Sequence, residues 1–241
     1  MDFIISRYSQ LLQSLREQGF LFMRVDDYMK VFSFQEEHIN DQTHNNLPDR
    51  NITTGNRSGQ KLVILRHDVD ARPQNSLKLA YLEHSLGIHG TYYFRMPNTF
   101  HVSIIREIAA LGHEIGYHYE TMATVGNDGI KRQRDLRTEE IRERETEGQS
   151  DEEKEKENEK QRKWNERVDV AYKLFMQNLS KLREIVPVTT ICMHGSPLSR
   201  YDNREIWGKY DYRELGILGE VSMDVDFSKV AYYTDTGRRW D

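Results

Sequence analysis

The segment RHDVD, residues 66–70, carries two carboxylates that could take part in hydrolytic or metal-dependent chemistry. It follows the apolar run 62–65, which is typical of a buried strand. In an extended chain residues i and i+2 point the same way, so Asp68 and Asp70 should share one side of the strand's carboxyl end. Neighbouring carboxylates repel when both are ionised, so we expect one to be protonated or neutralised by a metal ion. An Asp-rich surface turn before Pro73 is an equally good interpretation of this segment alone.

A histidine and an acid follow in the segment GHEIGYHYE, residues 112–120. His118 comes at the end of a predicted strand and shares an edge with Asp70 if the strands are parallel. Imidazole and carboxylate ligands suit zinc or a similar divalent ion. Glu120 either faces the same ion or is solvated, and His113 is expected to cap the preceding helix or to make a core hydrogen bond.

Two later segments place further polar side chains at predicted strand ends. His194 follows the strand predicted at 188–193, and Gly195 beside it allows close approach of a backbone. Asp235 follows a strand predicted at 230–233. A single histidine at such a place is usually structural. Several strand ends that carry Asp and His together favour a catalytic or metal-binding rim.

The elements that must position these residues alternate along the chain. Strands are predicted at 20–23, 62–65, 91–94, 114–117, 188–193 and 230–233, and helices at 8–18, 76–86, 104–111 and 170–182. This alternation predicts a mostly parallel sheet with right-handed crossovers, either an open doubly wound sheet or a closed barrel. The polar segment 35–60 is expected to be an exposed loop or insertion.

Composition excludes several classes of function. The 241 residues include 34 Lys and Arg against 39 Asp and Glu, a net charge of -5, which excludes a nucleic-acid reader that works through bulk positive charge. No common phosphate-binding glycine loop and no Gly-x-Ser-x-Gly elbow is present. With no long apolar run and no secretory start, a cytoplasmic protein without a membrane partner is expected. The single cysteine, Cys192, cannot form an internal disulfide and is expected to be a small buried hydrophobe.

Charge is concentrated in one stretch. Of the 37 residues 131–167, 25 are charged, and no apolar stripe accompanies them. We therefore expect a charged insertion at 127–167 that is helical and solvated or partly disordered. A partner-binding arm on an inert scaffold is the alternative interpretation of this stretch.

In their order, these motifs resemble the polysaccharide deacetylase superfamily, also called the NodB-homology or carbohydrate esterase 4 family. The likeness runs over about residues 62–240, through DVD at 68–70, GHEIGYH at 112–118, MHGSP at 193–197 and DTGRRW at 235–240. It implies a single NodB-like deacetylase domain over 1–241, with an α/β fold of the (β/α) barrel type. The family's late Leu-x-His motif has no match, so we expect the closing strands to be absent and the barrel to be incomplete at its carboxyl end.

The resemblance also implies roles for individual residues. Asp68 would be the general base, and Met122 stands where the family has a second metal-binding histidine, so Glu120 or His194 would take its place. The implied catalytic residues are Asp68, His194 and Asp235, the substrate-binding residues are His67, Arg95, Tyr117 and Trp240, and the metal ligands are Asp70, His118 and Glu120.

The activity implied by the resemblance is metal-dependent hydrolysis of an amide carbon-nitrogen bond. The expected reaction is N-deacetylation of an amino sugar or sugar conjugate, with a divalent metal, zinc, as cofactor and a carbohydrate or small amide as substrate. A different amide hydrolase on the same scaffold, or a non-catalytic carbohydrate-binding descendant, would share the same sequence features.

Overall fold

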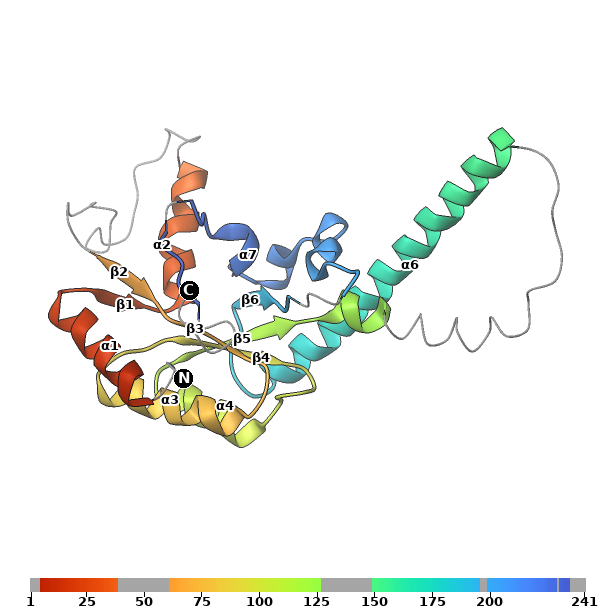
Figure 1. Ribbon diagram of the computed structural model, residues 1–241. Helices are drawn as coiled ribbons and strands as arrows, with labels where there is room; N and C mark the ends of the chain where they lie inside the picture. The colour runs from red at the N-terminus through yellow and green to blue at the C-terminus, as the bar shows by residue number, and fades with distance from the viewer. Residues whose placement is uncertain (1–4, 39–60, 127–148, 196–198, 229, 235–241) are drawn as a thin grey trace.

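Every strand pair in the described residues, 5–38, 61–126, 149–195, 199–228 and 230–234, is parallel in the computed structural model (Figure 1). The strands are β1 (Leu21–Met23), β2 (Leu62–Ile64), β3 (Arg66–Val69), β4 (Thr91–Arg95), β5 (Glu114–Tyr119), β6 (Thr190–Met193) and β7 (Gly219–Glu220). β1 pairs with β2, and the other five form one sheet in the order β3-β4-β5-β6-β7. Only Leu65 separates β2 from β3, so these two strands are consecutive parts of one extended segment. The parallel pairs therefore follow the chain order from β1 to β7.

This topology confirms a mixed α/β fold with a parallel sheet. In a doubly wound sheet the strand order reverses at a switch point. Here the order does not reverse, which is the order of a singly wound sheet. Within the described residues β7 does not pair with β1 or β2, so no closed barrel is seen.

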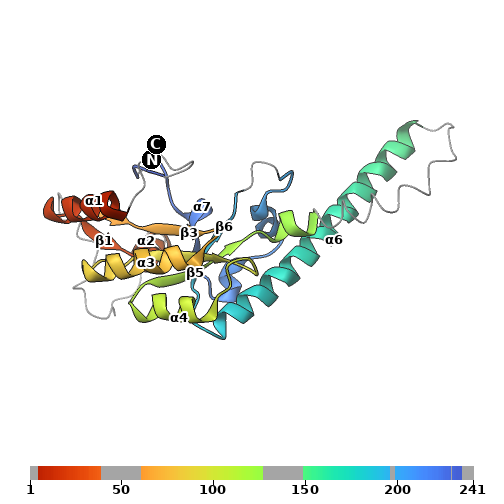
Figure 2. The ribbon, with the colours of Figure 1, turned by 60° about the horizontal axis from the view of Figure 1, so that its bottom comes forward.

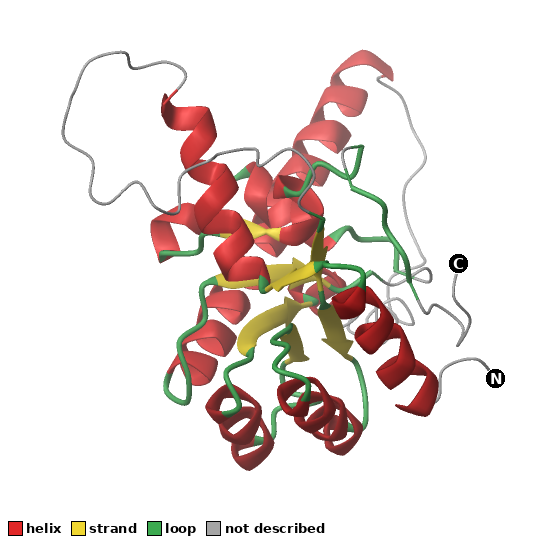
Figure 3. Cartoon of the chain, turned by 90° about the vertical axis from the view of Figure 1, so that its left-hand side faces the viewer, coloured by secondary structure: helices red, strands yellow, loops and turns green. Residues whose placement is uncertain are grey.

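One face of the sheet is covered by the helices that connect the strands. They are α3 (Pro73–Ser85), α4 (Val102–Ala110) and α6 (Gln149–Arg183), and α1 (Ile5–Glu17) packs next to α3. Sequential right-handed crossovers place connecting helices on the same face of a parallel sheet. Figure 3 shows helices packed against the sheet. Their apolar stripes meet alternate side chains of the strands in the main core, among them Val69, Phe94, Ile115, Tyr119 and Ile191.

The opposite face carries α2 (Val25–His38) and α7 (Val221–Asp224). Its smaller core contains Val25, Met29, Tyr93, Cys192 and Val221. The Tyr93 ring lies where a side chain on Gly116 would be, and the hydroxyl groups of Tyr93 and Thr190 are 2.8 Å apart. Glycine at position 116 therefore allows the ring to lie across the strands.

Two predicted elements differ from the structure. Residues 35–38, predicted as the start of a loop, belong to the last turn of α2, because the apolar side chains of Val25 and Met29 anchor that helix on the sheet. The strand predicted at 230–233 is wrong: these residues form no strand and belong to neither described sheet. Residues 39–60 lie outside the described part of the chain.

The charged stretch is helical where it is described. α6 is one helix of 35 residues, which begins at Gln149, within the charged stretch, and continues into the core. Its amino-terminal part extends away from the sheet (Figure 2). Residues 127–148 lie outside the described part. No helix among the described residues has both the length and the apolar character to cross a membrane.

Candidate metal centre

The polar residues predicted at strand ends gather on the face of the sheet that carries α2 and α7. In a strand successive side chains alternate between faces. Asp68 therefore lies on the same face as Arg66, and Cys192 lies on the same face as His194. In the parallel register Arg95 is opposite His118, and His118 is opposite Cys192. The carboxyl ends of β3, β4, β5 and β6 thus bring carboxylates, imidazoles and a guanidinium together.

Asp70, His118 and His194 form a group of possible metal ligands at this edge. One ligand atom from each lies within 4.8 Å of the other two. Nδ1 of His194 is 3.1 Å from Oδ1 of Asp70 and 3.1 Å from Nε2 of His118. Nε2 of His118 is 3.6 Å from the same Asp70 oxygen. We call these three residues the rim group.

His118 is held in the orientation that a metal ligand needs. Its side chain is 2% exposed, and its Nδ1 is 2.9 Å from the backbone oxygen of Cys192. A carbonyl oxygen can only accept, so Nδ1–H donates and the neutral ring keeps its lone pair on Nε2. Burial lowers the pKa of His118 despite the opposing charge of Asp68, which favours this neutral form. Metal-binding histidines commonly make such a second hydrogen bond.

The backbone of His194 is fixed on both sides. Its N–H donates to the carbonyl oxygen of Tyr119 at 2.8 Å, and its own carbonyl accepts from Nδ2 of Asn203 at 2.8 Å. Buried Asn203 also accepts from the backbone N–H of Ala123 through Oδ1, at 3.1 Å. Asn203 thus ties the segment after β6 to the segment after β5, a role that sequence analysis missed because no local pattern marks it.

Arg95 lies between two acids at the rim. Its Nη1 is 3.8 Å from Oδ1 of Asp70, and its Nη2 donates to Oε2 of Glu120. Burial opposes ionisation of Asp70, but the hydrogen bond from His194 and the nearby charges outweigh it, so the pKa of Asp70 is below its ordinary value. Glu120, predicted as a ligand, instead pairs with Arg95, and its Oε1 is 3.8 Å from Nε2 of His194.

Asp68 is exposed and lies two residues nearer the amino end of β3 than Asp70. Its Oδ2 is 3.0 Å from Nη2 of Arg66. Together with His118 and Cys192 it forms a second group whose ligand atoms lie within 4.8 Å of one another. Both possible ligand groups therefore include His118.

Two residues predicted to contact substrate lie on the other face of the sheet. His67 is 2.7 Å from Oε1 of Glu83 through Nε2 and stacks on Tyr92 at 4.4 Å between ring centroids. Tyr117 is 1% exposed, and its hydroxyl accepts from Nδ2 of Asn178 at 3.0 Å. Each is the direct neighbour of a residue on the site face, so alternation along the strand turns it away.

The remaining predicted residues are placed as follows. Nε2 of His113 is 3.0 Å from the carbonyl oxygen of Ala80, and its Nδ1 accepts from the N–H of Gly90, which confirms a core hydrogen bond. Asp235 and Trp240 lie outside the described residues.

Comparisons of this chain with protein-family models, with curated proteins and with solved structures found no match.

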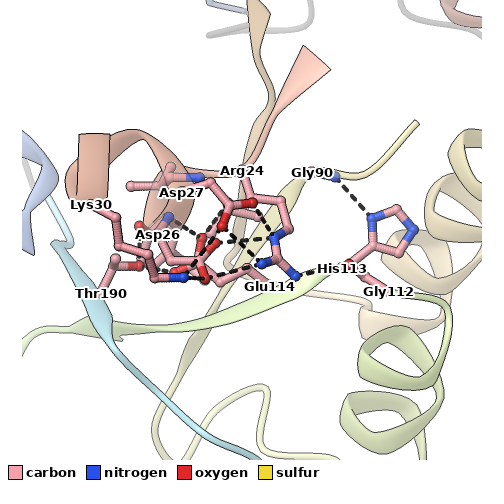
Figure 4. Close-up of polar contacts among 12 residues, drawn as sticks. Arg24, Asp26, Asp27, Lys30, Gly90, Gly112, His113, Glu114 and Thr190 are labelled. Atoms are coloured by element: carbon pink, nitrogen blue, oxygen red, sulfur yellow. Dashed lines mark hydrogen bonds and ion pairs between the residues drawn. The ribbon is translucent and has the colours of Figure 1, made fainter. Parts of the chain in front are cut away.

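A second polar cluster lies at the amino end of the same sheet face (Figure 4). Oε2 of Glu114 accepts from the hydroxyl of Thr91 at 2.7 Å and from the backbone N–H of Asp26 at 2.9 Å, and its Oε1 accepts from the hydroxyl of Thr190. Burial and the nearby charge of Asp26 raise the pKa of Glu114 to about 7. Arg24 binds Asp26 and completes this end of the sheet.

Proposed function

We propose that this chain is a metal-dependent hydrolase that cleaves an amide carbon-nitrogen bond. The observation that carries the proposal is the convergence of Asp70, His118 and His194 at the carboxyl end of the parallel sheet, where α/β folds place their active sites. The sequence likeness to polysaccharide deacetylases supports N-deacetylation of an amino sugar or sugar conjugate as the reaction. The sequential strand order supports an open relative of the NodB-type barrel.

The rim group fits a divalent ion such as zinc. It combines one carboxylate with two imidazoles, a common ligand set for zinc, and the carbonyl of Cys192 keeps the Nε2 lone pair of His118 directed at Asp70 and His194. When bound, the ion supplies Lewis acidity that polarises the amide carbonyl.

The residues around the rim group have separate tasks in this proposal. Asp68 accepts the proton of the attacking water and later transfers it to the departing amine. Arg66 pairs with Asp68 and holds its carboxylate in place. Arg95 fixes Asp70 and Glu120 in place. Water thus adds across the carbon-nitrogen bond, and the products are a carboxylate such as acetate and a free amine.

Two measurements test the proposal together. The chain is purified, dialysed and examined for bound metal by elemental analysis, and acetate release is measured from N-acetylated amino sugars. We expect about one zinc per chain, and we expect His118→Ala and His194→Ala to lose both the ion and acetate release. His101→Ala is the matched control, because His101 is exposed at the start of α4 and should leave both unchanged.

Asp68→Asn separates the base from the ligands. We expect this variant to keep zinc and lose acetate release, because the amide is similar in shape but cannot take the proton. Zinc that persists in His118→Ala would contradict the assignment of the site. Zinc at full occupancy in a chain that binds sugars without releasing acetate would instead favour the carbohydrate-binding alternative.

A further inference from the structure

Cys192 and His118 lie side by side on the site face. They are partners in the register between β5 and β6, and the structure leaves each 2% exposed. Asp68 comes from β3, and one ligand atom from each of the three residues lies within 4.8 Å of the others. Asp68 and Cys192 each precede a rim residue by two positions, so their backbone lies about 7 Å further from the carboxyl ends of the strands than that of Asp70 and His194. We call this the deeper group.

The deeper group differs from the rim group in the chemistry of its ligands. It replaces one imidazole by a thiol, and thiolates prefer soft, thiophilic ions. Its thiolate and carboxylate carry two negative charges, whereas the rim group supplies one from Asp70. A buried ion is costly unless its charge is balanced by its partners, and the second negative charge therefore suits a position beside the buried side chains of His118 and Cys192.

Neighbouring charges are compatible with such an ion. Arg66 binds Oδ2 of Asp68 at 3.0 Å, and the carboxylate can present its other oxygen to a metal. The Cys192 thiol is 2% exposed, and it exchanges its proton for the ion when the ion binds. Binding then forms one sulfur-metal bond and releases one proton to solvent.

We propose that Asp68, His118 and Cys192 form a second, deeper metal position that takes a thiophilic divalent ion and inhibits the enzyme. The inference rests on the proposed hydrolytic function, since both positions use His118. Its Nδ1 is engaged with the carbonyl of Cys192, so Nε2 serves one ion at a time. An ion in the deeper position removes His118 from the rim group and Asp68 from its role as base.

Cadmium is a suitable probe of the deeper position. The metal-free full chain is titrated with Cd²⁺, and thiolate-to-cadmium charge-transfer absorption is recorded in the ultraviolet. Because the chain has 1 cysteine, any such band reports Cys192. We expect a band that saturates at one ion per chain, and Cys192→Ser should lose the band and bind Cd²⁺ at least about tenfold more weakly.

His194→Ala is the matched variant, because His194 belongs to the rim group alone. It should lose the rim site and keep the cadmium band. A wild-type titration that binds Cd²⁺ without a band, or a band that disappears in His194→Ala, would overturn the deeper position and leave the proposed function standing. Cys192→Ala gives a second test if the serine variant does not fold, as judged by circular dichroism.

Zinc binding distinguishes failure of this inference from failure of the proposed function. Zinc that binds equally well to wild type and Asp70→Ala, together with an intact cadmium band, would overturn the rim site and leave the deeper position standing. A chain that binds neither ion would overturn both.

Discussion

At the amino end of the site face, hydrogen-bond donors surround a buried acid. At the carboxyl end, possible metal ligands lie close to one another. At the amino end, Glu114 accepts hydrogen bonds from Thr91, Thr190 and the backbone of Asp26, and its pKa is raised to about 7. At the carboxyl end, the lone pair of His118 faces other possible ligand atoms. Glu114 is buried at the amino end, whereas the Asp70 side chain at the carboxyl end is 49% exposed. What distinguishes the candidate ligand site is that one carboxylate and two imidazoles lie close together, whereas Glu114 is surrounded by hydrogen-bond donors.

The largest effect is expected at the carboxyl end. Asp70→Ala should remove zinc and reduce acetate release at least about 100-fold, because loss of a direct ligand should exceed the 10- to 100-fold effect of outer-shell changes. The Asp70 side chain is 49% exposed, so the free energy of unfolding of the metal-free chain should change by less than about 1 kcal/mol.

Elemental analysis, acetate release and urea denaturation check the Asp70 prediction. Glu159→Ala on the exposed part of α6 is the matched acid control and should leave all three unchanged. An Asp70→Ala chain that retains one zinc would contradict the metal site at the carboxyl end of the sheet.

The opposite pattern is expected at the amino end. Glu114→Ala should lower the free energy of unfolding by about 3 kcal/mol or more at pH 6, because buried donors of Thr91, Thr190 and Asp26 lose their acceptor. Zinc stoichiometry should be unchanged. Urea denaturation and elemental analysis on the same sample check both statements, and loss of zinc without loss of stability would contradict them.

The same carboxyl group predicts a pH dependence of stability. Glu114 has a pKa of about 7 in the fold against an ordinary value of 4.5, so the unfolded chain releases its proton first as the pH rises. The stability that comes from the protonated group is complete below pH 4.5 and is lost as the pH rises through about 7. The loss is on the order of 3 kcal/mol.

Glu114→Gln isolates that contribution. The amide does not ionise, so the difference in stability between pH 5 and pH 8 should be smaller in this variant by about 3 kcal/mol than in wild type. Urea denaturation across this range provides the measurement. Identical pH profiles for the two proteins would show that Glu114 titrates normally.

The smallest effect is expected on the far face of the sheet. Tyr117→Phe should lower the free energy of unfolding by about 1 kcal/mol, because Asn178 loses one hydrogen-bond partner. Zinc content and the KM for an N-acetylated sugar should not change, since Tyr117 is 1% exposed. A clear rise in KM would mean that this residue contacts substrate.

The predictable part of the site came from strand periodicity and parallel order. Both are local properties of the sequence, and they were sufficient to expect Asp70, His118 and His194 at one edge. The same alternation could also have excluded His67 and Tyr117, because each is adjacent to a residue of the site face. Their assignment came from the family likeness rather than from their own positions.

Other parts depend on tertiary contacts that sequence periodicity does not contain. Arg95 diverts Glu120 from the rim group through an ion pair between β4 and the end of β5. Asn203 holds His194 from 9 residues further along the chain. The segment 230–233 has the β-branched and aromatic composition of a strand, yet it belongs to neither of the described sheets.

The continuity of α6 gives the molecule a rigid rod. The helix contains neither proline nor glycine over its 35 residues, so it lacks the usual causes of a kink and spans about 50 Å. Near the middle of the rod, Nε1 of Trp164 donates to Glu205 at 3.1 Å, and Glu205 lies on the same short helix as Asn203. Two hydrogen bonds, from Trp164 to Glu205 and from Asn203 to the backbone of His194, therefore connect the rod to the rim group through one short helix.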